Sequence, residues 1–191
     1  MAKTLVMYYS KYGFTKKYAE WLAEELEADI YSIGRIRKKM LDKYEIIILG
    51  SSIYAGSISG TKILIKNFEK IKQKKLVVFT CGIADVTNVD SMTEINNKIM
   101  TAIPENIRPA IKLFNLQGGI IFPILSFRHR MILSILNKAL THKATSDLTE
   151  DNIRFLNAYG KNRDYTDREN ITEIVNYCRG VSNEGVAADG R

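Results

Sequence analysis

Three short segments of the chain carry the residues with the clearest chemical potential. The first runs from Ser10 to Thr15, between an apolar run and an expected helix. Free N–H groups at the start of a helix attract anions, the two hydroxyls add donors, and Gly13 lets the backbone approach closely. The segment lacks the glycine spacing of a P-loop and of the dinucleotide fingerprint. It is therefore a candidate phosphate site or, as the alternative, a capped turn between a strand and a helix.

The second segment, residues 50–56, has a glycine at each end, two serines and one central aromatic residue, Tyr54. An aromatic ring at the end of a strand can stack on a planar ligand; the alternative is a tyrosine packed beneath its own loop. The third segment, residues 80–88, offers backbone donors and acceptors near Gly82, with Asp85 and Asn88 beside them, although alone it is a generic loop. Together the three segments predict a site for a mononucleotide-like ligand with a flat ring.

Each of these segments follows a run of residues typical of a buried parallel strand. Such runs alternate with apolar patterns of helical period, so a parallel sheet covered by helices on both faces is expected. In a sheet of this kind ligands bind beyond the carboxyl ends of the strands, where all three segments lie. The expected strands are 4–9, 29–33, 45–50, 76–80 and 111–116. The last helix is expected to begin near Thr166, where Thr166 and Glu169 form a capping box.

Composition narrows the class of protein. The 191 residues are 46% hydrophobic and 26% charged, which suits one folded domain and argues against disorder, collagen or a disulfide-stapled miniprotein. Twenty-eight Lys+Arg against 21 Asp+Glu give a net charge of +7, which favours an acidic partner. Cys81 and Cys178 are far apart and are expected to be free thiols. With no apparent signal peptide or spanning segment, a cytoplasmic location is expected.

One stretch, residues 119–162, does not fit the alternation and is interpreted as an insertion around the fifth strand of a domain covering 1–180; residues 181–191 are expected to be a disordered tail. Residues 128–143 form an amphipathic helical pattern with several basic residues. Apolar plus basic side chains favour a helix lying on an anionic membrane surface; the alternatives are a helix packed on the domain edge or at a homodimer interface. No metal site and no nucleic-acid-binding module are predicted.

The three segments resemble those of the flavodoxin-like FMN-binding family, over about residues 3–180. Ser10, Gly13 and Thr15 match the phosphate loop of that family, Tyr12 stands where a hydroxyl residue is usual, and Tyr54 would lie against the isoalloxazine. The resemblance implies a doubly wound five-stranded parallel sheet in the order 2-1-3-4-5. The cofactor-binding residues it implies are Ser10, Lys11, Tyr12, Gly13, Phe14, Thr15, Ser51, Ser52, Ile53, Tyr54, Ala55, Gly56, Thr80, Cys81, Gly82 and Asp85.

A narrower resemblance links the insertion to the menaquinone-dependent protoporphyrinogen oxidases. It is carried by residues 118–123, 128–132 and 165–167. It implies an FMN-dependent oxidoreductase that oxidises protoporphyrinogen IX with a quinone as acceptor, in peripheral contact with the inner face of the membrane. Arg128 and Arg130 are then candidates for substrate propionates or lipid headgroups, and no catalytic acid or base is predicted. The alternatives are a flavodoxin-type electron carrier with a protein partner and an NAD(P)H:quinone reductase.

Overall fold

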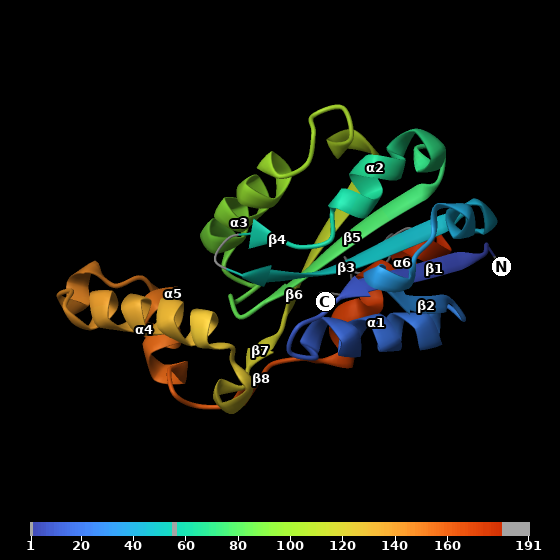
Figure 1. The fold of residues 1–191 in the computed structure, drawn as a ribbon. Coiled ribbons are helices and arrows are strands. Elements are labelled where there is room, and N and C mark those ends of the chain that lie inside the picture. Colours follow the sequence, from blue (N-terminus) through green and yellow to red (C-terminus); the bar gives the residue numbers. More distant parts are fainter. Residues whose placement is uncertain (1, 55–56, 181–191) are drawn as a thin grey trace, which may run out of the picture.

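The computed structural model describes residues 2–54 and 57–180 of the chain, so the tail predicted for 181–191 lies outside the described residues. Its centre is a parallel sheet, in which the five main strands follow the order β2-β1-β3-β5-β6 (Figure 1). This order confirms the predicted 2-1-3-4-5 arrangement. The strands are β1 (Thr4–Tyr9), β2 (Asp29–Ser32), β3 (Ile46–Tyr54), β5 (Lys75–Gly82) and β6 (Ile111–Gln117).

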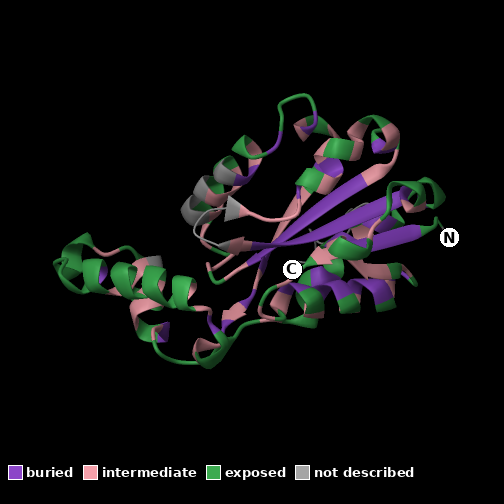
Figure 2. Cartoon of the chain, in the orientation of Figure 1, coloured by how far each residue is buried: buried purple, intermediate pink, exposed green. Residues whose placement is uncertain are grey.

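Helices cover both faces of the sheet, because its central strands are apolar on both sides. On one face Val6, Ile48 and Val77 pack against α1 (Phe14–Glu25) and α6 (Thr172–Arg179). On the other face Ile47 and Val78 pack against α2 (Lys62–Ile71) and α3 (Val89–Thr101). Figure 2 shows the resulting buried centre. Short 3-10 turns complete the connections: η1 (Ile33–Arg35), η2 (Lys38–Lys43) and η3 (Arg108–Ala110).

Strand β3 is longer than the sequence suggested. Residues from Gly50 to Tyr54, expected as a loop, continue the strand, and β3 then folds back as a hairpin onto β4 (Ser57–Ile58). Ser51 has a ladder partner on each side, Tyr9 of β1 and Thr80 of β5. The expected loop is therefore wrong, because pairing with two neighbouring strands extends the ladder past the serines.

The insertion comprises residues 119–164 in the structure. It begins at β7 (Gly119–Ile120) and ends at β8 (Arg163–Asp164), and these two strands pair in antiparallel fashion; we call them the neck. Figure 1 shows the helices of the insertion standing off from the layered domain. They are η4 (Phe122–Ile124), α4 (Phe127–Thr141), η5 (Thr145–Asp147) and α5 (Glu150–Ala158). Within the described part of the chain, no helix has the length and apolar character needed to cross a bilayer.

The segment that follows the neck does not contain the predicted capping box. The chain enters a 3-10 turn, η6 (Arg168–Ile171), before α6 begins at Thr172. Asp167 caps this turn, because its carboxylate accepts the N–H of Glu169 at 3.0 Å. Thr166 instead donates its N–H and its hydroxyl to Asp164, at 2.9 and 2.6 Å. The prediction was wrong because a better acceptor lies one residue further along the chain.

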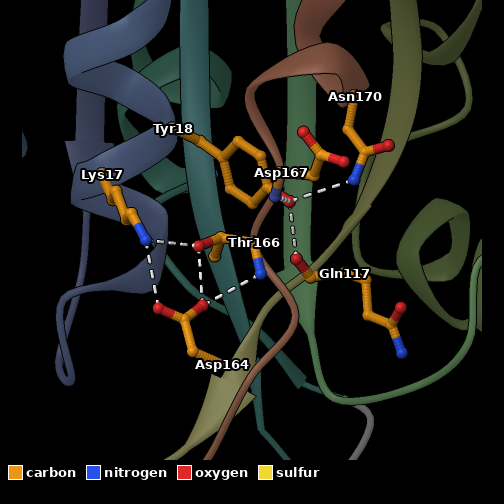
Figure 3. A network of polar contacts seen from close by, with 7 residues as sticks. All are labelled: Lys17, Tyr18, Gln117, Asp164, Thr166, Asp167 and Asn170. Atoms are coloured by element: carbon orange, nitrogen blue, oxygen red, sulfur yellow. Dashed lines mark hydrogen bonds and ion pairs between the residues drawn. The ribbon is translucent and has the colours of Figure 1, made fainter.

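A polar network fastens this returning segment to α1 (Figure 3). The hydroxyl of Tyr18, a fully buried residue, donates to the Gln117 carbonyl at 2.7 Å and accepts the N–H of Asp167 at 3.2 Å. Beside it the Lys17 ammonium donates to Asp164 at 3.0 Å and to Thr166 at 2.7 Å. The two ends of the insertion are thereby held against the same helix of the sheet domain.

Candidate functional site

A cavity of about 290 Å³ opens at the carboxyl ends of β1, β3 and β5. More than half of the lining residues belong to the three segments singled out in the sequence, and the others are Gly118, Leu125 and residues of the neck and of α4. The predicted residues in the wall are Ser10, Tyr12, Phe14, Thr15, Ser52, Ile53, Cys81 and Gly82. The further residues include Ile83, Gly118, Gly119, Leu125, His129 and Ile132. The insertion is thus part of the site.

One end of the cavity is formed by the N-terminus of α1. Gly13 precedes the helix with a φ of 100°, a conformation that side-chain-bearing residues rarely adopt, and its N–H donates to the Ser10 hydroxyl at 3.1 Å. Among the described residues no side chain caps this helix, and its first turn holds no acidic residue. The first N–H groups of a helix lack partners within the helix. They therefore form an electropositive surface suited to a phosphate.

The hydroxyls of Thr15 and Ser52 are buried behind this surface. Ser52 donates to the Tyr9 carbonyl at 2.9 Å, and the two hydroxyl oxygens lie 3.1 Å apart. Because a serine hydroxyl has one proton, Thr15 must donate to Ser52 in this arrangement. Donors to an anion here are then the backbone N–H groups of α1 rather than the Thr15 hydroxyl.

Lys11 and Tyr12, both predicted as cofactor contacts, reach toward the insertion. The Tyr12 hydroxyl lies 2.7 Å from His129 Nδ1 and accepts the N–H of Ser126 at 3.1 Å. Lys11 lies outside the cavity wall, where its ammonium donates to the Ser126 hydroxyl at 3.3 Å. Partial burial and the nearby Lys11 charge lower the pKa of His129 below its ordinary value. These contacts close the beginning of α4 over the phosphate end of the cavity.

The other end of the cavity is apolar. Ile53 and Ile83 line it beside Gly82, where a Cβ would lie 3.7 Å from that of Ile53, an ordinary contact distance. Burial raises the pKa of the Cys81 thiol to about 12, so the group stays protonated at neutral pH. The backbone of Tyr54 ends β3 nearby. Its side chain, and residues Ala55 and Gly56, lie outside what the structure describes.

Three other predicted cofactor contacts have different partners. The Ser51 hydroxyl is buried and bonds to both the N–H and the carbonyl of Ser59. Thr80 is buried and donates to the Asn115 side chain at 2.6 Å. Asp85 forms an ion pair with Arg154 of α5 and also accepts from Thr87. None of these three residues lines the cavity. Arg128 and Arg130 do not line it either, and the Arg130 guanidinium lies 3.4 Å from the Phe122 carbonyl.

The sequence analysis did not assign His129, Gly118 and Gly119 to the site. Local spacing could not have linked His129 to Tyr12, because 117 positions separate them. The glycine pair carried a usable signal. A Cβ at Gly118 would lie 2.7 Å from the Cys81 sulfur, and one at Gly119 would lie 2.2 Å from the Arg163 carbonyl oxygen. Adjacent glycines directly after a strand indicate such a close approach.

The chain is similar to known proteins both in sequence and in structure. A protein of Methanocaldococcus jannaschii described as uncharacterised is 36% identical over 81 residues, covering 41% of this chain and 53% of that protein. The chain thus spans about half the length of this curated relative. Oxidised flavodoxin 2 from Bacillus cereus is 16% identical, with 82% of this chain and 94% of that chain covered and a TM-score of 0.42.

Two further solved structures are similar in part. A flavodoxin, WrbA-like protein from Agrobacterium tumefaciens is 26% identical over 53% of this chain and 72% of that chain, with a TM-score of 0.41. A flavoprotein from Lactobacillus acidophilus, solved in complex with FMN, is 17% identical over 61% of this chain and 93% of that chain, with a TM-score of 0.35. The family model described as a flavodoxin domain matches residues 5–147. That model covers three quarters of the chain, and the strand order is the one that the resemblance to this family implied. The chain therefore belongs to the flavodoxin-domain family.

Proposed function

We propose that this chain is an FMN-dependent oxidoreductase. The observation that carries the proposal is the cavity at the carboxyl ends of β1, β3 and β5, which joins the uncapped N-terminus of α1 to an apolar end. Membership of the flavodoxin-domain family supports FMN as the cofactor and a redox function. Both ends of the cavity fit this group, because a phosphate needs N–H donors and a flat apolar ring needs apolar walls.

The chain's own residues would bind and orient the cofactor. Gly13 and the first N–H groups of α1 would hold the phosphate, with Ser10 beside them. Ile53 and Gly82 would border the ring, and the resemblance to the flavodoxin-like family implies that Tyr54 would stack on it. Bound FMN supplies the acceptor and donor of electrons, while the protein supplies position and electrostatics. The protonated Cys81 would contribute volume rather than a nucleophile.

We further propose protoporphyrinogen IX as the electron donor and a quinone as the acceptor. Oxidation of protoporphyrinogen IX to protoporphyrin IX releases six electrons and six protons, which reduce three quinones to three quinols, so the exchange balances. The net charge of +7 supports a donor that carries carboxylates. The first turns of α4 support contact with an anionic membrane, because Phe127 is 80% exposed and Arg128 and Arg130 are exposed beside it.

Titration of the apoprotein with FMN tests the cofactor site. In Ser10→Asp a carboxylate at the N-terminus of α1 would repel the phosphate, so we expect FMN affinity to fall at least tenfold. Ser10→Asn, which has the same shape without the charge, should bind much more tightly than Ser10→Asp. Stability should not fall in Ser10→Asp, because the aspartate carboxylate can accept the Gly13 N–H as the serine hydroxyl does. Equal affinity in the two variants, or no binding by the parent protein, would refute the site.

Turnover tests the reaction. With FMN bound, we expect protoporphyrin to accumulate from protoporphyrinogen IX only when a quinone is added, followed by its absorbance. A protein that exchanges electrons with redox partners but shows no such turnover would be an electron carrier instead. Rapid bleaching of the flavin by NADPH without a partner enzyme would identify an NAD(P)H:quinone reductase.

A further inference from the structure

A second, larger cavity lies beside the first, on the side of the insertion. Its volume is about 570 Å³, and it lies between the segment after β5, the facing sides of α4 and α5, and the end of the neck. Ile83 lines both cavities, so a single side chain stands between them at this point. A molecule held in the second cavity would therefore lie next to the apolar end of the first.

The wall of the second cavity combines an apolar surface with two arginines. Leu136 and Leu140 of α4 face Phe155 of α5 across it, while Arg154 and Arg163 bring positive charge. Asp85 is the acidic residue among the described lining residues, so cationic groups are in excess. A cavity of this composition suits a largely apolar molecule that carries an anionic group.

The two arginines are in different states. Arg154 is ion-paired with Asp85 and lies 3.7 Å from the Glu150 carboxylate, so its charge is compensated and its side chain is held in place. Arg163 extends from β8, and no carboxylate among the described side chains forms an ion pair with it. Guanidinium groups bind carboxylates with paired N–H donors. Arg163 is therefore the group available to an anionic ligand.

We propose that this second cavity binds the electron donor of the reaction, that the donor is an apolar molecule bearing a carboxylate, and that Arg163 binds the carboxylate. The redox part of this inference rests on the proposed function, because it requires FMN in the neighbouring cavity. It replaces Arg128 and Arg130 as the groups that hold the substrate, since both lie outside the two cavities. The donor loses electrons and protons, and the quinone becomes a quinol.

The test uses two fluorescent probes of similar shape, titrated into the full chain with and without saturating FMN. The anionic probe is 1-anilinonaphthalene-8-sulfonate, whose sulfonate stands in for a carboxylate, and the neutral probe is N-phenyl-1-naphthylamine. Arg163→Gln should weaken binding of the anionic probe about tenfold, as expected for loss of a charged hydrogen bond, and leave the neutral probe within about twofold. Arg128→Gln, a matched arginine of the insertion, should change neither probe.

A second pair of variants tests the cavity itself. Leu136→Trp would fill the cavity and should weaken both probes, whereas Ile135→Trp, at an exposed neighbouring position outside it, should weaken neither. The inference is overturned if Arg163→Gln and Arg128→Gln behave alike, or if Leu136→Trp leaves both probes unchanged. FMN affinity, measured separately, should be the same in all four variants. If the parent protein binds the probes as expected but not FMN, the proposed function and the donor role fail, while the anion site stands.

Discussion

The sheet domain and the insertion differ in how much apolar surface each one buries. In the sheet, Ile47, Ile48 and Leu49 are completely buried, as are their neighbours on β1 and β5. In α4, Leu140 is buried, but Phe127 and Ile135 are 80% and 62% exposed. Burial of apolar surface is the main source of stability. The sheet domain therefore holds its own structure, whereas the insertion depends on the neck, on the network around Tyr18 and on what binds to it.

This difference suggests that the sheet domain is the more rigid region and the insertion the more adaptable one. The buried strands position the ends of β1, β3 and β5, where the cavity proposed as the cofactor site lies. The insertion closes over that site through Tyr12 and His129 and forms most of the second cavity. Regions with few buried contacts open more readily than a core does. If the second cavity binds the donor as proposed, the insertion, which buries less apolar surface than the sheet, selects the substrate.

The largest expected loss of stability comes from a substitution in the core of the sheet. Ile48→Ala should lower the free energy of unfolding by about 2–5 kcal/mol, because it leaves a cavity in a fully buried position. Ile135→Ala on α4 should change it by less than about 0.5 kcal/mol. Urea unfolding followed by circular dichroism measures both. A cost for Ile135→Ala comparable to that of Ile48→Ala would mean that α4 is buried in solution, as in a homodimer.

A substitution where the insertion meets the sheet domain should lower the free energy of unfolding by an intermediate amount. Tyr18→Phe removes the hydroxyl that joins Gln117 at the end of β6 to Asp167 beyond the neck, and both backbone groups lose a partner. We expect a loss of about 1–3 kcal/mol in the same urea experiment. Tyr165→Phe, at an exposed tyrosine of the same returning segment, serves as the control and should be close to neutral. Similar losses in the two variants would show that the network contributes little.

The next prediction compares basic residues of the insertion with basic residues of the sheet domain in binding to lipid. Replacing Arg128 and Arg130 by Ser should weaken partitioning onto anionic vesicles by about 2 kcal/mol in total, at about 1 kcal/mol for each basic residue. Replacing Lys38 and Lys39, two exposed lysines of the sheet domain, should have little effect. Sedimentation with vesicles measures both variants. If the two pairs weaken partitioning equally, the protein binds lipid through its overall charge and the insertion has no special role.

The smallest expected effect concerns the ion pair at the neck. Partial burial raises the pKa of the Asp164 carboxyl, but hydrogen bonds from Thr166 and Lys17, together with the lysine charge, outweigh burial and bring that pKa below its ordinary value. A lowered pKa in the folded state stabilises the protein above the unfolded-state value of about 3.9, and this contribution is lost as the pH falls through the folded-state pKa.

The variant Asp164→Asn measures this contribution. Because both partners of the ion pair are about half exposed, we expect it to cost less than about 1 kcal/mol at neutral pH. The difference from the parent protein should shrink as the pH is lowered below about 3.9. A difference that stays constant with pH would assign the effect to hydrogen-bond geometry rather than to charge.

Local patterns in the sequence predicted the architecture well. Uncharged aliphatic runs such as 46–49 are typical of buried central strands, and their alternation with patterns of helical period predicts a parallel sheet. The position of the first segment, between β1 and α1, was predicted for a similar reason. Gly13, which adopts a positive φ, and the helix that follows are local features, so the N-terminus of α1 could be recognised from spacing alone.

What the sequence could not predict depends on partners that are distant along the chain. Gly50 to Tyr54 were interpreted as a loop because the pairing of Ser51 with β1 and β5 is not a local property. Asp85 was predicted as a cofactor contact, whereas its pairing with Arg154 arises only when α5 folds back. For the same reason Arg163, separated from the third segment by the whole insertion, was not considered.

The neck begins and ends the insertion at adjacent positions, since Gly119 is paired with Asp164. Evolution can therefore lengthen, shorten or exchange everything between these points without breaking a strand of the sheet. The residue at the start of the neck cannot vary so freely, because a side chain at Gly119 would collide with the Arg163 carbonyl and with the ring of Phe14. A new specificity could thus be grafted onto this scaffold, provided that the glycine at the point of attachment is retained.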